Sequence, residues 1–179
     1  SGLVQARDWE DGKLRWEYRF SGRTADPICS EDAIIFKNPH SGLTCLNVNN
    51  GKVRWEMPRF VKGGWNIIDG KLYIYLIPGS LACIDVASGR RDYLPFLKSD
   101  RLTAAPQRFG DIFCFPAEGG RLLFTRQKEV LNELRVDGKW AETIANDKCV
   151  YAFNDKELQL YAIEANEAKV LWKAKLEID

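Results

Sequence analysis

Few residues in this sequence have types that could support catalysis, and none has the spacing that catalysis requires. His40 is the only histidine, and it lies beside Ser41 in the loop Asn-Pro-His-Ser-Gly. A nucleophilic serine needs a base that a third group orients and an oxyanion hole, which two neighbours in a Pro/Gly loop do not supply. We therefore expect His40 to be an exposed loop residue and the chain to have no catalytic group.

The cysteines and acidic residues do not indicate a metal site either. Cysteine occurs at five separate positions, which are Cys29, Cys45, Cys83, Cys114 and Cys149. Each lies in an apolar run, so we interpret them as buried free thiols, which are typical of a reducing compartment. A single histidine and the lack of CxxC argue against zinc. Asp8, Glu10 and Asp11 before Gly12 are residues that hairpin turns require, and calcium usually needs more convergent carboxylates. We expect no metal and no cofactor.

Composition places the chain among ordinary globular proteins. It has 179 residues, 45% hydrophobic and 28% charged, with a formal net charge of +1. These values exclude a disordered, collagenous or coiled-coil chain, and the balanced charge argues against nucleic-acid binding through the overall field. The first residues lack the blocks of a signal peptide, and the longest apolar stretch, 72–86, is interrupted by Pro78, Gly79 and Asp85. We expect a cytoplasmic protein without membrane contact.

A repeated motif is the main signal in the sequence. A small residue stands six positions before a glycine, Asp or Asn stands four before it, and Trp stands four after it. Gly12 and Gly51 carry this motif 39 positions apart, and Gly89 follows 38 positions later with Tyr93 in the Trp position. Ala168 with Trp172 lies 79 positions further on, which is two periods, and a degenerate copy is expected near Lys128 and Glu129.

A second motif of the same period lies between the copies of the first. Polar turns at Asp32, Gly70, Gly110 and Asp147 each lead into an apolar strand, at intervals of 38, 40 and 37 residues. Turn residues between β-branched or aromatic runs predict hairpins. Two hairpins per period give four strands per 38 to 40 residues, which is the size of a β-propeller blade.

The first motif resembles the repeat of the pyrroloquinoline-quinone-like β-propellers, the quinoprotein alcohol dehydrogenase-like superfamily. This resemblance covers nearly the whole chain and implies an all-β propeller of four-stranded antiparallel blades. It further implies that Trp16, Trp55 and Trp172 dock one blade on the next, and that Gly12, Gly51 and Gly89 form the outer turns. The enzymes of the superfamily hold their quinone beside a vicinal disulfide, and no Cys-Cys pair occurs here. The resemblance is therefore to a non-catalytic member.

The motifs predict about four and a half blades in a single domain, 1–179. The expected repeats are approximately 1–20 (partial), 24–60, 64–97, 103–135 and 140–176. Residues 1–20 supply an outer hairpin without an inner one. Either a small five-bladed ring forms with a thin first blade, or the chain is a partial propeller that another segment or a second chain completes. Because a closed ring removes exposed sheet edges, self-association is one expected way to complete the first blade.

Basic residues in the loops between strands suggest a partner-binding surface. The candidate partner-binding residues are Trp9, Arg23, Lys37, His40, Arg59, Lys62, Lys98 and Arg101. A basic loop face would suit an acidic protein surface, although solubilising side chains would give the same pattern. Trp9, in an outer turn, would either anchor a partner or pack over a neighbouring blade.

We therefore expect a non-enzymatic protein-binding propeller, such as an inhibitor, an immunity protein or an assembly scaffold. The alternative is a propeller that binds a small ligand, or a non-catalytic part of a larger quinoprotein-like enzyme.

Overall fold

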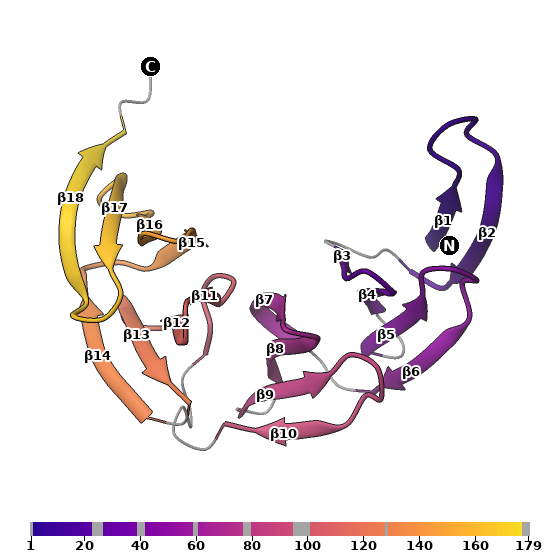
Figure 1. Ribbon diagram of the computed structural model, residues 1–179, viewed down its shortest axis with the longest axis horizontal. Helices are drawn as coiled ribbons and strands as arrows, with labels where there is room; N and C mark the ends of the chain where they lie inside the picture. Colours follow the sequence, from indigo (N-terminus) through magenta and orange to yellow (C-terminus); the bar gives the residue numbers. More distant parts are fainter. Residues whose placement is uncertain are drawn as a thin grey trace.

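The protein is an open arc of antiparallel β-sheets (Figure 1). The computed structural model describes residues 2–22, 27–38, 42–58, 61–76, 80–94, 101–127 and 129–176. These residues form five sheets and no helix. We name the sheets blades 1 to 5 in chain order, and blade 1 has two strands whereas each other blade has four. The all-β fold of four-stranded propeller blades is thus confirmed.

Each blade is a meander whose strands follow the chain from the inside of the arc to its outside (Figure 1). The strands are β1 (Gly2–Arg7) and β2 (Leu14–Phe20) in blade 1; β3 (Ile28–Cys29), β4 (Ala33–Asn38), β5 (Gly42–Asn47) and β6 (Val53–Met57) in blade 2; β7 (Val61–Ile68), β8 (Lys71–Leu76), β9 (Ser80–Asp85) and β10 (Arg91–Tyr93) in blade 3; β11 (Gln107–Phe109), β12 (Ile112–Ala117), β13 (Arg121–Arg126) and β14 (Glu129–Arg135) in blade 4; and β15 (Trp140–Ala145), β16 (Val150–Asn154), β17 (Gln159–Glu164) and β18 (Lys169–Lys175) in blade 5.

Burial explains why strands at different depths differ in composition. The middle strands β5, β8 and β13 are each buried at four of their six positions, because neighbouring blades cover both of their faces. The outer strands β2 and β18 carry many charged residues and are largely exposed. Their charged side chains also discourage pairing with a foreign strand.

A separate hydrophobic cluster fills each of the four junctions between successive blades. Phe36 lies in the cluster between blades 1 and 2, Ile74 between blades 2 and 3, Phe115 between blades 3 and 4, and Trp140 between blades 4 and 5. Trp65 and Trp140 are 8% and 0% exposed, so both residues belong to the core. The stability of the arc is therefore largely a sum of contacts between neighbours.

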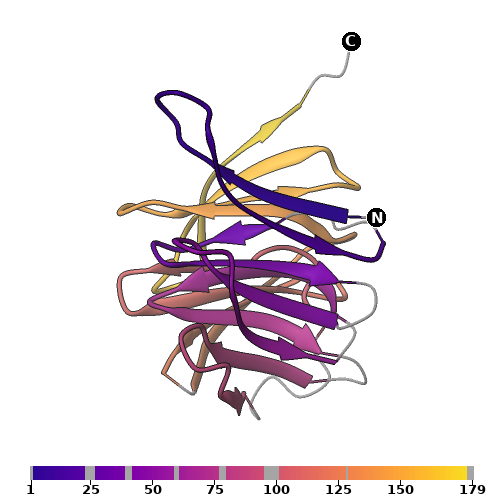
Figure 2. The ribbon, with the colours of Figure 1, turned by 90° about the vertical axis from the view of Figure 1, so that its right-hand side faces the viewer.

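The arc does not close into a five-bladed ring, so it corresponds to the partial-propeller alternative (Figures 1 and 2). The contacts between inner strands join β3 to β7, β7 to β11 and β11 to β15. Among the described residues, blade 1 has no inner strands that could continue this series to β15. The contacts that bring blades together at the centre of a ring are thus missing at the N-terminal end.

One expectation about the thiols is wrong. Cys45, Cys83, Cys114 and Cys149 are buried, but Cys29 is exposed, and all five are free. The reason is that Cys29 ends the two-residue inner strand β3. An apolar run in the sequence does not reveal that a strand is this short and lies at the edge of its sheet.

Candidate protein-interaction surfaces

The meander divides the connections between strands into two faces of the arc. The turns 8–13, 48–52, 86–90 and 165–168, with the inner hairpin turns 30–32, 69–70, 110–111 and 146–148, lie on one side, which we name the turn face. The C-terminal ends of β2, β4, β6, β8, β10, β12, β14 and β16 lie on the opposite side, which we name the loop face. Figure 2 views the arc edge-on, with the two faces at its left and right margins.

Trp16 joins blade 1 to blade 2 on the turn face. Its side chain is 9% exposed, and its indole Nε1 donates a hydrogen bond of 2.7 Å to the carbonyl oxygen of Val48. Gly51, with φ +68°, lies under the ring, and a Cβ there would be 2.6 Å from an atom of Trp16. Only a glycine meets both requirements, the positive φ and the missing side chain.

Trp55 makes the same contact between blades 2 and 3. Its Nε1 donates to the carbonyl oxygen of Val86 at 2.8 Å, and a Cβ on Gly89 would be 2.7 Å from Cγ of Trp55. The glycine has φ +72°. The blade-docking roles of both tryptophans and the turn roles of Gly51 and Gly89 are thereby confirmed.

The third junction departs from this pattern. The prediction that Tyr93 takes the position that Trp55 has in blade 2 is wrong. In blade 2 a β-bulge between Cys45 and Leu46 sets Trp55 opposite Cys45. The pairing of β9 with β10 has no bulge, so Asp92 stands opposite Cys83 and Tyr93 stands opposite Ala82. Because side chains alternate between faces along a strand, Tyr93 faces the other way. A groove of about 550 Å³, lined by Asp92, Tyr93 and Gln127 among others, remains at this junction.

Sequence reasoning missed the residue that serves the fourth junction. Asn132 stands opposite Phe124, just before a bulge at the usual place. Its side-chain Nδ2 donates to the carbonyl oxygen of Asn166 at 2.8 Å, in the outer turn of blade 5. Asparagine thus replaces the tryptophan but keeps the hydrogen bond to the next turn. The shortened turn before it, with Gln127 at φ +54° in place of glycine, hid the equivalence.

The two ends of the arc hold the separate halves of this contact. Trp172 lies on β18 opposite Ala162, as Trp55 lies opposite Cys45, but no blade follows among the described residues and its side chain is 46% exposed. It contacts only the ring of Tyr151 in its own blade among the described aromatic side chains, at 6.0 Å between centroids. At the other end, Gly12 has φ +71° and no atom within 4 Å of a Cβ placed on it.

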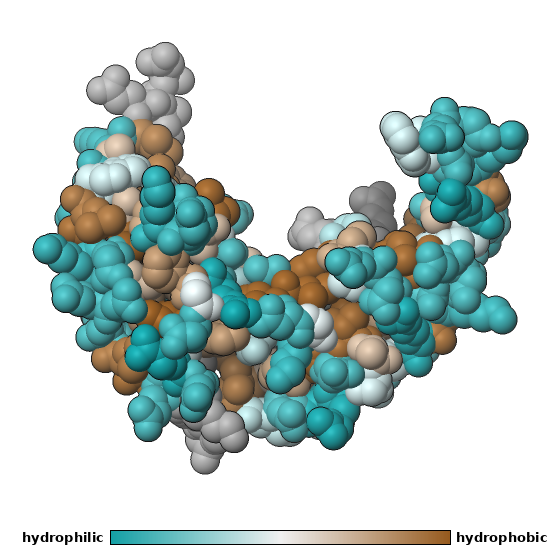
Figure 3. Space-filling view, in the orientation of Figure 1, coloured by the Kyte–Doolittle hydropathy of each residue, from teal (hydrophilic) through white to brown (hydrophobic). Residues whose placement is uncertain are grey.

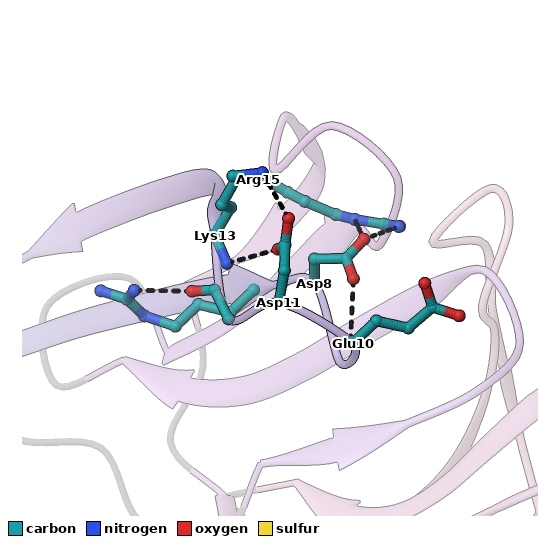
Figure 4. A network of polar contacts seen from close by, with 7 residues as sticks. Asp8, Glu10, Asp11, Lys13 and Arg15 are labelled. Atoms are coloured by element: carbon teal, nitrogen blue, oxygen red, sulfur yellow. Dashed lines mark hydrogen bonds and ion pairs between the residues drawn. The ribbon is translucent and has the colours of Figure 1, made fainter.

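Ion pairs hold the turn around Gly12 in shape (Figure 4). Arg15 bonds Asp8 at 2.5 Å, Lys13 bonds Asp11 at 2.6 Å, and Asp8 Oδ1 accepts the backbone N–H of Glu10 at 2.9 Å. The hydrogen bond from Arg15 lowers the pKa of Asp8, and that from Lys13 lowers the pKa of Asp11. Both carboxylates are therefore ionised at neutral pH and accept these hydrogen bonds.

Trp9 is the most exposed of the large apolar side chains that the structure describes, at 89%. It stands three residues before Gly12, where Val86 and Ala165 stand relative to Gly89 and Ala168. These two are 3% and 0% exposed. The backbone N–H of Val86 donates to the inner hairpin turn of its own blade, at Gly70. Blade 1 has no such hairpin among the described residues, so a position that is buried in blades 3 and 5 is open at Trp9.

The predicted basic residues are only partly described. Arg23, His40, Arg59 and Lys98 lie outside the described residues, and so does the side chain of Lys62. Lys37 and Arg101 are described, and each has a local partner. Lys37 places its ammonium 5.0 Å from the ring centroid of Trp65, and Arg101 pairs with Glu118 at 3.0 Å. Trp9 is on the turn face, away from Lys37 and Arg101, so one flat contact does not include all three.

Other groups with reactive chemistry are not arranged in a site. Burial raises the pKa of Cys45 to about 11 and also raises the pKa values of Cys83 and Cys114, so these thiols are neutral at physiological pH. In the described part of the chain no three His, Cys, Asp or Glu side chains are placed to hold a metal ion. A helix able to span a bilayer is likewise absent from the described ranges.

Known proteins share both the repeat and the fold. A family model described as outer membrane protein assembly factor BamB matches residues 1–92. The crystal structure of BamB from Moraxella catarrhalis superposes with a TM-score of 0.67 at 14% identity, covering 99% of this chain and 59% of that one. Hsv2 from Kluyveromyces marxianus gives 0.78 at 11% identity, covering 99% and 64%. A europium-containing methanol dehydrogenase gives 0.72 at 11%, covering 97% and 47%.

These structural identities establish the fold alone, and this chain spans less than two thirds of the length of each of these three proteins. No curated protein sequence matches the chain. The family match extends over half of the chain, in the region where Trp16 and Trp55 dock their blades. The repeat, the open propeller arc and this match together show that the chain belongs to the PQQ-like β-propeller family whose model bears the description of BamB.

Proposed function

We propose that this chain is a non-enzymatic protein-binding module and that Trp9 is its main anchor. The observation that supports the proposal is the 89% exposure of an indole at the tip of a turn that ion pairs hold in shape. Tryptophan is enriched among the residues that dominate binding energy, and such residues lie inside a polar rim. Asp8, Glu10, Asp11 and Lys13 provide that rim around Trp9.

Rigidity makes the turn suitable for binding. The backbone N–H of Gly12 donates to the carbonyl of Asp8 at 2.9 Å, and Arg7 donates to the carbonyl of Gly12 at 3.0 Å. A contact residue that is already ordered loses little conformational entropy when a partner binds. The Trp9 backbone therefore needs no rearrangement to present its side chain.

A second part of the proposal concerns the loop face. The sequence places Arg23, His40, Arg59, Lys62 and Lys98 in or beside its connections, with Lys37 and Arg101 next to them. We propose that these residues favour a partner with an acidic surface and raise its rate of association. Because Lys37 and Arg101 are engaged with Trp65 and Glu118, the other residues would provide most of this attraction.

Two further observations support a protein-binding role in a reducing compartment. The matched family model is named for an assembly factor, which is a protein that acts by binding other proteins. All five thiols are free, which supports a reducing compartment such as the cytoplasm. An inhibitor or immunity protein and an assembly scaffold both fit such a module.

The test is quantitative capture of partners from native lysate on immobilised protein, read by mass spectrometry. We expect one stoichiometric protein on the wild type and its loss with Trp9→Ala. Ile144→Ala, which truncates another well-exposed apolar side chain, is the matched control and should keep the partner. If the partner is kept by Trp9→Ala and lost only from a variant in which Arg59, Lys62, Lys98 and Arg101 are all changed to Glu, the contact lies on the loop face instead. Equal capture by every variant, or none by the wild type, would contradict the proposal.

A further inference from the structure

No described residue of another blade covers the side of blade 5 that faces away from blade 4. Ile144, Tyr151, Ala162 and Trp172 stand opposite one another across β15, β16, β17 and β18. Directly opposed residues of antiparallel strands project from the same side of a sheet. The four side chains therefore form one row across the whole blade.

The same row joins blade 2 to blade 3. There it consists of Ile28, Ile35, Cys45 and Trp55, which all belong to the hydrophobic cluster of that junction. In blade 5 no further blade covers the row among the described residues, and Ile144 and Trp172 are 64% and 46% exposed. Figure 3 shows brown, hydrophobic surface on the C-terminal arm of the arc.

The N-terminal end offers the matching receptor. The turn at Gly12 has φ +71°, against +68° at Gly51 and +72° at Gly89. The glycine N–H donates to the residue four positions earlier in all three turns, at 2.9, 2.9 and 2.8 Å. The carbonyl of Trp9 occupies the position from which Val48 accepts the indole of Trp16. Among the described residues nothing lies over Gly12.

The residues at the ends are better suited to docking than those at two of the internal junctions. Blades 3 and 4 carry Asp92 and Asn132 where a tryptophan stands in blades 1 and 2. The two ends of the described arc nevertheless carry Trp172 and Gly12. These are the residue types that make the turn contacts of Trp16 with Gly51 and of Trp55 with Gly89. Within the part of the chain that the structure describes, Trp172 thus has no neighbouring turn to dock on, and the turn at Gly12 has no tryptophan over it.

We propose that two copies of the chain dock head to tail, with Trp172 of one copy over Gly12 of the other and its indole N–H donating to the carbonyl oxygen of Trp9. In Figure 1 the arc is U-shaped, with blade 5 and blade 1 at its two tips. Rotation of a second copy by half a turn about the viewing axis brings each C-terminal tip to the N-terminal tip of the other copy. Such a heterologous contact, made twice, closes the assembly as a dimer.

The contact buries the outer part of the bare face, because blade 1 has only two strands. Leu3 and Leu14, which are 45% and 48% exposed on blade 1, supply part of the receiving side. The strand register places Gln5, Arg7, Glu17 and Arg19 on the same side, so the receiving surface is apolar at its edges and charged between them. Ile144, on the inner strand β15, lies where blade 1 has no counterpart and stays exposed in the dimer.

Sedimentation velocity over a range of concentrations tests this proposal by complementation. We expect the wild type to dimerise, and Trp172→Ala and Gly12→Asn each to be monomeric. Asparagine tolerates a positive φ, so Gly12→Asn fills the receptor without breaking the turn. Each variant keeps one intact end, so an equimolar mixture should form a heterodimer joined by a single contact, with weaker affinity than the wild-type dimer.

Matched controls separate docking from folding. Leu171→Ala removes an exposed apolar side chain from the same strand, and Gly110→Asn alters another turn glycine with positive φ and no neighbour within 4 Å. Both should dimerise like the wild type, and circular dichroism should show all four variants folded. A monomeric wild type, dimers of either single variant, or a mixture without heterodimer would overturn the proposal. Trp9→Ala keeps the backbone carbonyl oxygen of residue 9 and should therefore dimerise. Loss of the lysate partner thus tests the proposed function, and loss of the dimer tests the head-to-tail contact.

Discussion

Replacing Gly89 with alanine tests how tightly the blades are joined. The new Cβ would lie 2.7 Å from Cγ of Trp55, in a residue whose φ is +72°. The left-handed backbone costs an alanine about 1–2 kcal/mol, and overpacking against a fixed side chain costs about 1–3 kcal/mol. We expect Gly89→Ala to lower the free energy of unfolding by the sum, about 2–5 kcal/mol.

Gly70→Ala in the same blade is the matched control. Gly70 has φ +69°, and no atom lies within 4 Å of a Cβ placed there. This variant should therefore lose only the backbone contribution, about 1–2 kcal/mol. The difference between the two variants, about 1–3 kcal/mol, measures the contact of residue 89 with Trp55.

Urea unfolding, followed by tryptophan fluorescence and far-ultraviolet circular dichroism, gives both free energies. The pair of substitutions is repeated in a Trp55→Ala background, where the extra cost at Gly89 should vanish, as a double-mutant cycle requires. Equal losses for Gly89→Ala and Gly70→Ala, or an extra cost that persists without Trp55, would refute the docking geometry.

Three further outcomes follow from the structure. Gly64→Ala should lower the urea midpoint more than Gly70→Ala, because its Cβ would overlap the backbone of Ala104, which faces it across the junction; an equal midpoint would contradict that close approach. Under native conditions a disulfide reagent should modify one thiol quickly, and Cys29→Ser should abolish this reaction, since the remaining described thiols are buried; rapid modification of several thiols would be inconsistent with the core. The hydrogen bond from Arg121 lowers the pKa of Glu133 below its ordinary 4.5, so the stabilisation is present above that pH and is lost as the pH falls through the lowered value. Stability curves of wild type and Glu133→Gln should therefore converge in acid, and parallel curves would argue against this pair.

The repeat made most of the fold predictable. Turn residues at Gly12, Gly51 and Gly89 fixed the outer hairpins because a positive φ restricts the residue type, and the tryptophans four positions later marked two junctions correctly. The spacing of the repeat did not reveal that the β-bulge of the outer strand pair is absent from blade 3. Without one in β9–β10, Tyr93 turns away from the face that its sequence position suggested.

The candidate surfaces were less predictable than the fold. Trp9 could be singled out because it stands between charged residues, and the repeats predicted that residues 1–20 form an outer hairpin without an inner one. The sequence did not show that this arrangement leaves Trp9 89% exposed, whereas Val86 is buried at the same position of blade 3. Charge along the sequence could not show that Lys37 lies over Trp65 or that Arg101 pairs with Glu118. Such pairings join segments whose relative position is set by the stacking of blades.

Hydrogen exchange of the indole N–H groups, measured by NMR at a concentration where the protein is monomeric, tests the open arc most directly. The N–H groups of Trp16, Trp55 and Trp140 donate to carbonyls of the neighbouring blade and should exchange slowly. Those of Trp9 and Trp172 should exchange as fast as a free indole, because both side chains are exposed at the ends of the arc. Slow exchange at Trp172 in the monomer would mean that the ends meet within one chain, and would contradict the account.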